Sequence, residues 1–586
     1  MVTKPLLLSL SLNTLESAMT NRPAPPPFVP HLPPSSLPDQ PLLRSLFPSG
    51  MEDIDPNGDI CSEVFKQIFP DSFRHVVPVY DFSEVTKLLL RWDRAAQRLE
   101  ILEALYALNG LKPTMRTGLL GLWGDKVDAI DHYQKLVQKL NTKIKIARRR
   151  AKFSAPSRCS FVIFDNQIDA AVAAQSVLLP LDGTKFVTHR APGPDNVNWL
   201  SLFKTNNEKF VRRLLMLPLI LFIIIFPSGF FLSAMTVLNQ LFCTPTTPVY
   251  WEWYCETDSM IGILLKRLVT GWLPSLLITI WQNVIVTRVF YMVALVECVA
   301  YSLSGVDRRI SSLYFYWGFF NIFLGSVLSG SLFTLIGQAV TLTNVRAILE
   351  VVGQGITNSS TFLTNYVLLR ALFLVPFKLF FPHPGILNYV LRSILSVTCF
   401  KGVGITRRQR FQAWEPKSFM YGREAGTVML MTLIGVVYCS TSPITVAVVG
   451  MYFLGMFLVV RHHLLYVYAR NYEGGGELWP LLFDRFVIML VTMAYFTACQ
   501  LITKQAWPQA VVIFITAPII LWKFWSVCTK RYREVSENVP LDIGWRQPKA
   551  HVPPEMYIPS ELRSQSVGWH PEQGKAWSGY GLPRWL

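Results

Sequence analysis

Apolar runs of about 20 residues dominate the chain from Phe210 onward, and short polar connections separate them. A run of this length crosses the apolar core of a bilayer, which is about 30 Å thick. Hydropathy therefore predicts about eight membrane-spanning helices. The predicted spans are Phe210–Leu238, Leu268–Leu295, Leu313–Leu342, Thr361–Phe381, Thr427–Ser440, Val446–Tyr468, Leu481–Ile502 and Ala510–Val527. The fifth run is short, so we expect its helix to begin nearer Phe419.

Lys and Arg residues in the connections predict which side each loop faces, because cytosolic loops hold the excess. One alternate set of connections contains Arg308, Arg309, Lys401, Arg407, Arg408, Arg410, Arg470, Lys530, Arg531 and Arg533. The other set has fewer, namely Lys266, Arg267, Arg346 and Lys504. The first set is therefore predicted to be cytosolic, and an even number of spans places both termini in the cytosol.

The residues before the first span follow a different pattern. Residues 1–73 are rich in proline and are expected to form a disordered leader. Residues 74–209 alternate strand-like and helix-like patterns, which predicts a cytosolic α/β domain. Its expected elements are strands over 74–80 and 159–164 and helices over 81–108, 126–150 and 170–175. The transmembrane region then covers 210–528, and 529–586 form a cytosolic tail.

A basic run over residues 143–152 admits two interpretations, an RNA-recognition module or a helix face near anionic lipid. The aromatic strand with which RNA-recognition modules stack bases is not matched. Phe161-Val-Ile-Phe164 has no basic-Gly-aromatic-Gly element before it. We therefore expect membrane lipids, and no nucleic acid, as partners of this domain.

The composition supports a membrane protein and argues against an ordinary soluble enzyme. Of the 586 residues, 51% are hydrophobic and only 16% are charged, against about 25% charged in soluble domains. The net charge of +17 fits an anionic membrane surface. Neither a catalytic constellation nor Cys and His at metal-ligand spacing occurs in the sequence, so no catalytic residue, metal or cofactor is expected. Cys243 and Cys255 in a predicted non-cytosolic loop could form a disulfide or remain free thiols.

Several short motifs occur in order along most of the chain. They include Gly118-Leu-Leu-Gly121, Phe161-Val-Ile-Phe164, Ala191-Pro-Gly-Pro-Asp195, Trp272-Leu-Pro274, Asn321-Ile-Phe-Leu324, Tyr438-Cys-Ser-Thr-Ser-Pro443 and Asn471-Tyr-Glu-Gly-Gly-Gly-Glu-Leu-Trp-Pro480. In these motifs the sequence resembles the OSCA family of hyperosmolality-gated, calcium-permeable, mechanosensitive cation channels, which includes animal transmembrane protein 63. The resemblance implies an anoctamin-like α-helical channel fold with an RNA-recognition-like cytosolic domain. That domain follows the third span of the family, so the sequence resembles the family without its first three membrane helices.

The resemblance also implies a function and its partners. The expected activity is a mechanically or osmotically gated, non-selective cation channel through which calcium, potassium and sodium pass. A homodimer and a plasma-membrane location are implied as well. Two alternatives remain open at this stage, an anoctamin-like phospholipid scramblase and a non-conducting truncated member of the family.

Ionisable groups at membrane depth are costly, so those in the predicted spans are candidates for the permeation path. Glu297, at the inner end of the second span, matches a glutamate of the family and is the first candidate. The alternative is a structural ion pair with Arg308 or Arg309.

Polar residues on the third and fourth spans complete the set of pore-lining candidates. Asn321, Ser331 and Gln338 share part of one face of the third span, where they could line a pore or bond to another helix. The fourth span carries Asn365, Arg370 and Lys378, with no acidic residue between them. Family members commonly place a glutamate in this part of the span. Its absence predicts weaker calcium passage if the two cations face the pore.

Overall fold

The computed structural model describes residues 59–116, 126–153, 156–175, 188–204, 206–225, 280–327, 345–380 and 418–533, with residues 276, 406–408, 411, 416, 535, 553–559 and 562. Two compact units make up the chain. The first contains Met1–Phe82, Arg149–Asp195 and Val535–Arg563, and the second contains Ser83–Arg148, Asn196–Glu534 and Ser564–Leu586. The domain boundaries expected near residues 73, 209 and 528 stay predictions. Residues 59–68, within the stretch expected to be a disordered leader, form a helix whose Phe65 side chain is buried.

The first unit is built around a pair of antiparallel strands. Strand β1 (Phe73–Tyr80) pairs with β4 (Pro156–Phe164), and helices α3 (Asp59–Ile68) and α6 (Gln167–Gln175) accompany them. The apolar residues of β4 and α6 form a small core with one ring of α3, and its buried members are Phe65, Val162, Phe164, Ala170, Ala171 and Ala173. The two strands and the short helix predicted from the alternating pattern are thereby confirmed.

Two long helices joined by a short hairpin begin the second unit. Helix α4 (Ser83–Asn109) leads into strands β2 (Thr114–Arg116) and β3 (Lys126–Asp128), which pair antiparallel, and α5 (Ala129–Phe153) follows and runs on past Arg148, into the first unit. Both helices were predicted, although Lys126 to Asp128 form a strand. The described strands make two separate two-stranded sheets. The four-stranded sheet of an RNA-recognition-like fold is therefore not confirmed.

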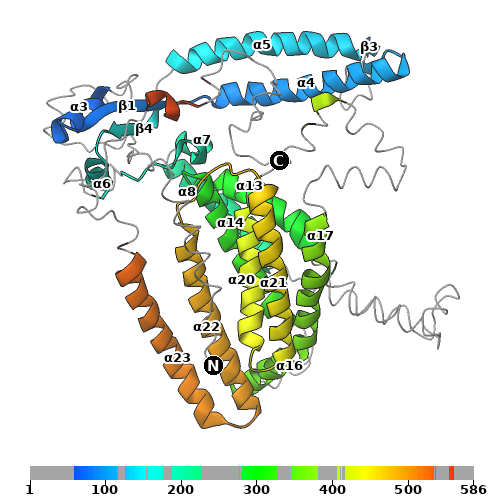
Figure 1. Cartoon of the computed structure of the whole chain (residues 1–586), viewed down its shortest axis with the longest axis vertical. Coiled ribbons are helices and arrows are strands. Elements are labelled where there is room, and N and C mark those ends of the chain that lie inside the picture. Colours follow the sequence, from blue (N-terminus) through cyan, green and yellow to red (C-terminus); the bar gives the residue numbers. More distant parts are fainter. Residues whose placement is uncertain are drawn as a thin grey trace, which may run out of the picture. The chain divides into compact units, whose positions relative to one another are not determined.

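The remainder of the second unit is a bundle of apolar helices, whose α-helical parts are labelled in Figure 1. They are α8 (Asn206–Ile225), η6 (Gln282–Val286) with α13 (Thr287–Glu297), α14 (Leu303–Trp317) with η7 (Gly318–Leu324), α16 (Val345–Leu369) with η8 (Arg370–Leu374) and α17 (Val375–Phe380), α20 (Tyr421–Tyr438), α21 (Pro443–Tyr466), α22 (Leu478–Thr503), and α23 (Trp507–Cys528) with η10 (Thr529–Arg533).

Five helices among the described residues are long and apolar enough to cross a membrane. They cover Leu303–Val327, Gly353–Phe380, Pro443–Tyr466, Leu478–Thr503 and Trp507–Arg533, and they correspond to the third, fourth, sixth, seventh and eighth predicted spans. Helix α20 matches the fifth and begins at Tyr421, close to the expected start. Helix α8 matches part of the first span, and η6 with α13 matches part of the second. Residues 226–238, 268–275 and 277–279 of these spans lie outside the described residues.

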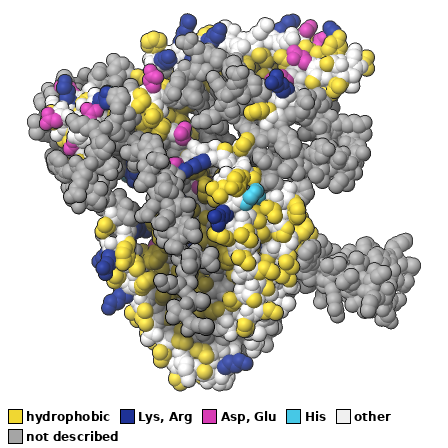
Figure 2. All heavy atoms as spheres, viewed as in Figure 1, with side chains coloured by type: hydrophobic (Ala, Val, Ile, Leu, Met, Phe, Trp, Pro, Cys, Tyr) yellow, Lys and Arg dark blue, Asp and Glu magenta, His cyan; other side chains and the backbone are white. Residues whose placement is uncertain are grey.

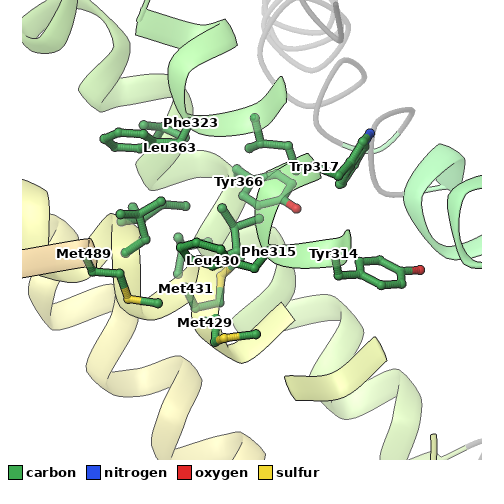
Figure 3. Packing of buried hydrophobic residues seen from close by; sticks show 14 of the residues in the cluster. Tyr314, Phe315, Trp317, Phe323, Leu363, Tyr366, Met429, Leu430, Met431 and Met489 are labelled. Carbon is green, nitrogen blue, oxygen red and sulfur yellow. The ribbon is translucent and has the colours of Figure 1, made fainter. Parts of the chain in front are cut away.

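Close packing of α14 against α20 forms the centre of the bundle. Two glycines of α20 one turn apart allow it, because a Cβ at Gly422 would lie 2.8 Å from the Asp307 carbonyl oxygen and one at Gly426 would overlap the Cβ of Tyr314. Small residues at this spacing are typical of closely packed membrane helices. The core around them is aromatic and rich in methionine, as the labelled side chains of Figure 3 show.

The outer surface of the bundle is largely apolar. Hydrophobic side chains cover much of the face shown in Figure 2, and the most apolar window of α23 has none of its residues buried. Water does not stabilise such a surface, whereas lipid chains do. The protein is thus a mostly helical, multi-pass membrane protein, as predicted.

Candidate functional site: polar residues between the membrane helices

One buried polar group of the described bundle joins η6 to α16 and η8. Gln282 and Arg370 are 1% and 4% exposed. The Tyr366 hydroxyl donates to Gln282 Oε1 at 2.8 Å, and Arg370 Nη2 donates to the Tyr366 oxygen at 2.7 Å and also to Gln282 Oε1. The Arg370 guanidinium lies 4.8 Å from the centre of the Tyr366 ring. We call Gln282, Tyr366 and Arg370 the Arg370 layer.

Three stretches of π-helix contain buried polar residues of the bundle. Gln282 begins η6, Arg370 begins η8, and Asn321 lies within η7. An additional residue in a helical turn widens it and turns the following side chains, and such turns are frequent at functional sites. The backbone thereby directs these polar side chains toward neighbouring helices.

A second buried group joins α17 to the first turn of α20. Lys378 Nζ lies 2.6 Å from Glu424 Oε2, while Arg423 Nη2 and Nε lie 2.7 and 3.2 Å from Glu424 Oε1. Glu424 is buried, and a carboxylate in the first turn of a helix is favoured by the helix dipole. We call Lys378, Arg423 and Glu424 the Glu424 cluster. It pairs a cation of the fourth predicted span with an acid from the fifth.

Asp307 on α14 forms a third buried polar group. Its carboxylate accepts hydrogen bonds from the Tyr291 hydroxyl at 3.3 Å and from the Tyr472 hydroxyl. Burial, followed by the nearby Asp307 carboxylate, raises the pKa of the Tyr472 phenol above its usual value. Tyr472 is therefore protonated and is the donor in this pair.

Glu297, the first pore candidate, is the last residue of α13 and is 1% exposed. Arg309 holds both of its oxygens, with Nη2 at 2.8 Å from Oε1 and Nε at 2.9 Å from Oε2. This two-bond geometry is the strongest form of a carboxylate pair. The pairing is the alternative considered from the sequence, and a role in permeation would require the two side chains to separate.

The other predicted pore residues have different surroundings. The Asn321 amide donates to the carbonyl oxygens of Ile223, at 3.1 Å, and of Ile224, so it joins η7 to α8. Asn365 is half-buried on α16. Ser331 and Gln338 lie outside the described residues, as do Cys243 and Cys255. The part of Ser331 and Gln338 in a pore stays a prediction, and so does the state of the two cysteines.

Sequence reasoning missed Gln282, Asp307 and Glu424. Each lies within or beside an apolar run, where a polar residue indicates function or pairing. Glu424 could have been found as the acid needed by Lys378, but hydropathy does not show which helices are neighbours. Among the described residues, no group of three His, Cys, Asp or Glu could hold a metal ion. What the arrangement offers is a polar connection between α13, α14, α16–α17 and α20.

Apolar helices of spanning length around buried ionisable residues define a multi-pass membrane protein with polar residues between its helices. The family model described as "Calcium-dependent channel, 7TM region, putative phosphate" matches residues 213–500. A second, "Cytosolic domain of 10TM putative phosphate transporter", matches residues 49–200. Together they match most of the chain.

Curated relatives agree with these models. "Hyperosmolality-gated Ca2+ permeable channel 1.3" of Arabidopsis thaliana is 28% identical over 496 residues, which are 83% of this chain and 62% of the relative. "CSC1-like protein ERD4" of Brassica juncea is 26% identical over 542 residues, 89% of this chain and 70% of the relative. The chain thus spans about six-tenths of the length of several curated relatives. It belongs to the OSCA family of hyperosmolality-gated, calcium-permeable channels, whose names denote channels and not enzymes.

Proposed function

We propose that this chain forms a cation channel, permeable to calcium, potassium and sodium, that opens under osmotic or mechanical stress and has no enzymatic activity. The observation that carries the proposal is the line of buried polar and charged side chains on α13, α14, α16–α17 and α20. Such residues are costly among apolar helices unless they serve an ion pathway or bond to one another. The names of the relatives supply the stimulus and the ion.

The described arrangement corresponds to a closed path, because its ionic side chains bond to each other. Lys378 and Arg423 neutralise Glu424, and Arg309 neutralises Glu297. Ions would pass once the helices part and these carboxylates become available to cations. Glu424 then supplies a negative charge beside Lys378, which the sequence of the fourth span alone does not provide.

Gating by tension requires only two states of unequal area in the membrane. The π-helical stretches η6, η7 and η8 lie in three neighbouring helices and offer places where a helix can shift its register. We place the protein in the plasma membrane with both termini in the cytosol. Membrane lipids or a second copy of the chain cover the exposed surface of α23.

The test is a recording of stretch-activated current from the whole chain in reconstituted liposomes, with a calcium gradient and a parallel dithionite assay of lipid flipping. We expect current without flipping. Glu424→Gln should shift the reversal potential toward that of the anion, because two cations then remain without their acid. Glu84→Gln, an exposed residue of α4, is the matched control and should change nothing. Lipid flipping without current would instead support a scramblase.

A further inference from the structure

A short segment, Asn196–Asn198, fastens one chain connection to the bundle. The chain passes from the first compact unit to the second between Asp195 and Asn196. Asn196 and Asn198 are 6% and 2% exposed. Asparagines buried to this extent need hydrogen-bond partners. The amide nitrogens of both find acceptors in the bundle, and the amide oxygen of Asn196 finds a donor there.

Asn196 bonds to the first turn of α14 and to one loop at once. Its Nδ2 donates to Ser304 Oγ at 3.0 Å and to the Glu473 carbonyl oxygen at 3.2 Å. Its Oδ1 accepts from the Ser304 backbone N–H at 2.9 Å. One side chain thus connects the start of α14 with the loop between α21 and α22.

Asn198 bonds to the turn between α13 and α14. Its Nδ2 donates to the Ala300 carbonyl oxygen at 2.9 Å, and its backbone N–H donates to the Tyr301 carbonyl oxygen at 2.8 Å. Between the two asparagines, Val197 pairs antiparallel with Ser302. We call Asn196 and Asn198 the asparagine clamp.

The turn held by the clamp is short and joins two helices of the candidate site. It reverses at Cys298, whose φ of 51° lies in the left-handed region, and α14 begins at Leu303 with Ser302 as its cap. Glu297 ends α13, while Asp307 and Arg309 lie in the first two turns of α14. A displacement of the turn therefore moves both sides of the Glu297–Arg309 pair and the Asp307 group.

We infer that the asparagine clamp positions the α13–α14 turn for gating, so that force on the connection at Asp195–Asn196 reaches the helices of the ion path. This inference rests on the proposed function. Without the clamp the connection would move independently of the turn, and more membrane tension would be needed to open the channel. Unit conductance would not change, because neither asparagine lies among the ion-path residues.

The first test is Asn196→Ala in the whole chain, recorded in excised patches. At the pressure that half-opens the wild type, the open probability should fall by at least about 5-fold, the lower end of ordinary coupling between sites. Ser201→Ala is the matched control. Among the described residues the buried Ser201 hydroxyl donates to the Asn198 carbonyl oxygen of its own segment, at 2.9 Å, and not to the α13–α14 turn. It should leave the pressure response unchanged.

The second test restores the clamp covalently. Val197 and Ser302 oppose each other in an antiparallel bridge, where Cα atoms lie about 4.5–5.5 Å apart, a separation that a disulfide spans. In an Asn196→Ala, Cys298→Ser chain, Val197→Cys with Ser302→Cys should recover the wild-type pressure response under oxidation and lose it on reduction. Ser302→Cys alone, treated in the same way, should not recover it.

The outcomes separate the clamp from the proposed function. A wild type without stretch-activated current would overturn the proposed function and the clamp with it. A wild-type current with an unshifted or lowered threshold in Asn196→Ala would overturn the clamp alone. The clamp would also be overturned if Asn196→Ala changed the unit conductance. It would be overturned as well if the disulfide formed and the threshold of the Asn196→Ala chain did not return toward that of the wild type.

Discussion

Buried carboxylates in the described bundle each have a partner, and the identity of the partner sets what a substitution does. Glu297 meets Arg309, Glu424 meets Lys378 and Arg423, and Asp307 meets two tyrosine hydroxyls. Removing the cation of a buried pair leaves a charge that water cannot reach, which costs far more than removing an exposed one. Substitution of the partly exposed cation therefore shows how strongly the buried carboxylate depends on its partner.

Arg309→Gln should destabilise the protein more than Glu297→Gln. Arg309 is 33% exposed and can reach water when alone, whereas Glu297 is 1% exposed and cannot. Loss of Arg309 is expected to cost about 3–5 kcal/mol, and thermal unfolding of the purified protein measures the order. Arg308→Gln is the matched control, because Arg308 pairs with Glu477 at the surface, where a pair contributes about 1 kcal/mol or less.

The same variants decide whether Glu297 takes part in permeation. If it is a structural partner of Arg309, Glu297→Gln leaves unit conductance unchanged at low and at physiological salt. A carboxylate at the pore mouth would behave differently. Its loss lowers conductance most at low salt, where the field of the charge reaches farther than the screening length of about 8 Å at physiological salt. Single-channel recordings at the two salt concentrations distinguish these results, and a salt-dependent fall would return Glu297 to the ion path.

The buried polar residues of the candidate site could be found from the sequence, but the residues that they bond to could not. A polar residue in an apolar run is visible in any hydropathy plot, and Glu297, Asn321 and Arg370 were found in this way. That Arg370 bonds to Gln282, or that Glu424 meets Lys378, depends on which helices are adjacent. Elementary rules applied to one sequence do not show which helices are adjacent.

At the scale of elements, helix lengths follow from the apolar runs, whereas helix distortions do not. The spans after Pro443 agree with hydropathy within a few residues. The stretches η6, η7 and η8 leave no comparable signal, because a π turn depends on packing around it and not on apolar content. The packing of α14 on α20 is an intermediate case. In the sequence, Gly422 and Gly426 indicate that α20 packs closely against another helix, but they do not show that this helix is α14.

Gly426→Ala should disturb the bundle, whereas Gly450→Ala should not. A Cβ at Gly426 would overlap Tyr314 of α14, while one at Gly450 on α21 meets no atom within 4 Å. Overfilling a packed interface costs about 1–3 kcal/mol, and alanine in an open helical position is favoured over glycine by about 1 kcal/mol. The unfolding temperature should fall for Gly426→Ala and rise for Gly450→Ala. Equal effects would show that α14 and α20 are not in close contact.

At the scale of the whole molecule, the helices after α20 form hairpins whose turns gather at two ends. The Gln500 amide donates to Thr441 Oγ1, so the α20–α21 turn lies beside the end of α22. Ser418 pairs with Ala469, and Tyr472 bonds to Asp307, so the α21–α22 loop lies beside the starts of α20 and α14. The structure fixes which loops share an end, and the distribution of Lys and Arg predicts which end is cytosolic.

Membrane topology can be measured with single cysteines restored one at a time to a cysteine-free chain. Cys439 follows α20, Lys504 follows α22, and Glu477 precedes α22, and all three are exposed. We expect Cys439 and Lys504→Cys to react with an impermeant maleimide in intact cells. Glu477→Cys should react only after digitonin opens the plasma membrane. Reaction of Glu477→Cys alone in intact cells would reverse the orientation given by the Lys and Arg excess.

Two other patterns of labelling carry separate meanings. If Cys439 and Lys504→Cys react on opposite sides, the Gln500–Thr441 contact is wrong, because two turns at one end of a bundle face one compartment. If no site reacts in intact cells and only Glu477→Cys reacts after digitonin, the orientation holds but the host membrane is internal. The second result would leave the helix arrangement intact and would remove the plasma membrane from the proposed function, since the outer turns would then face a lumen.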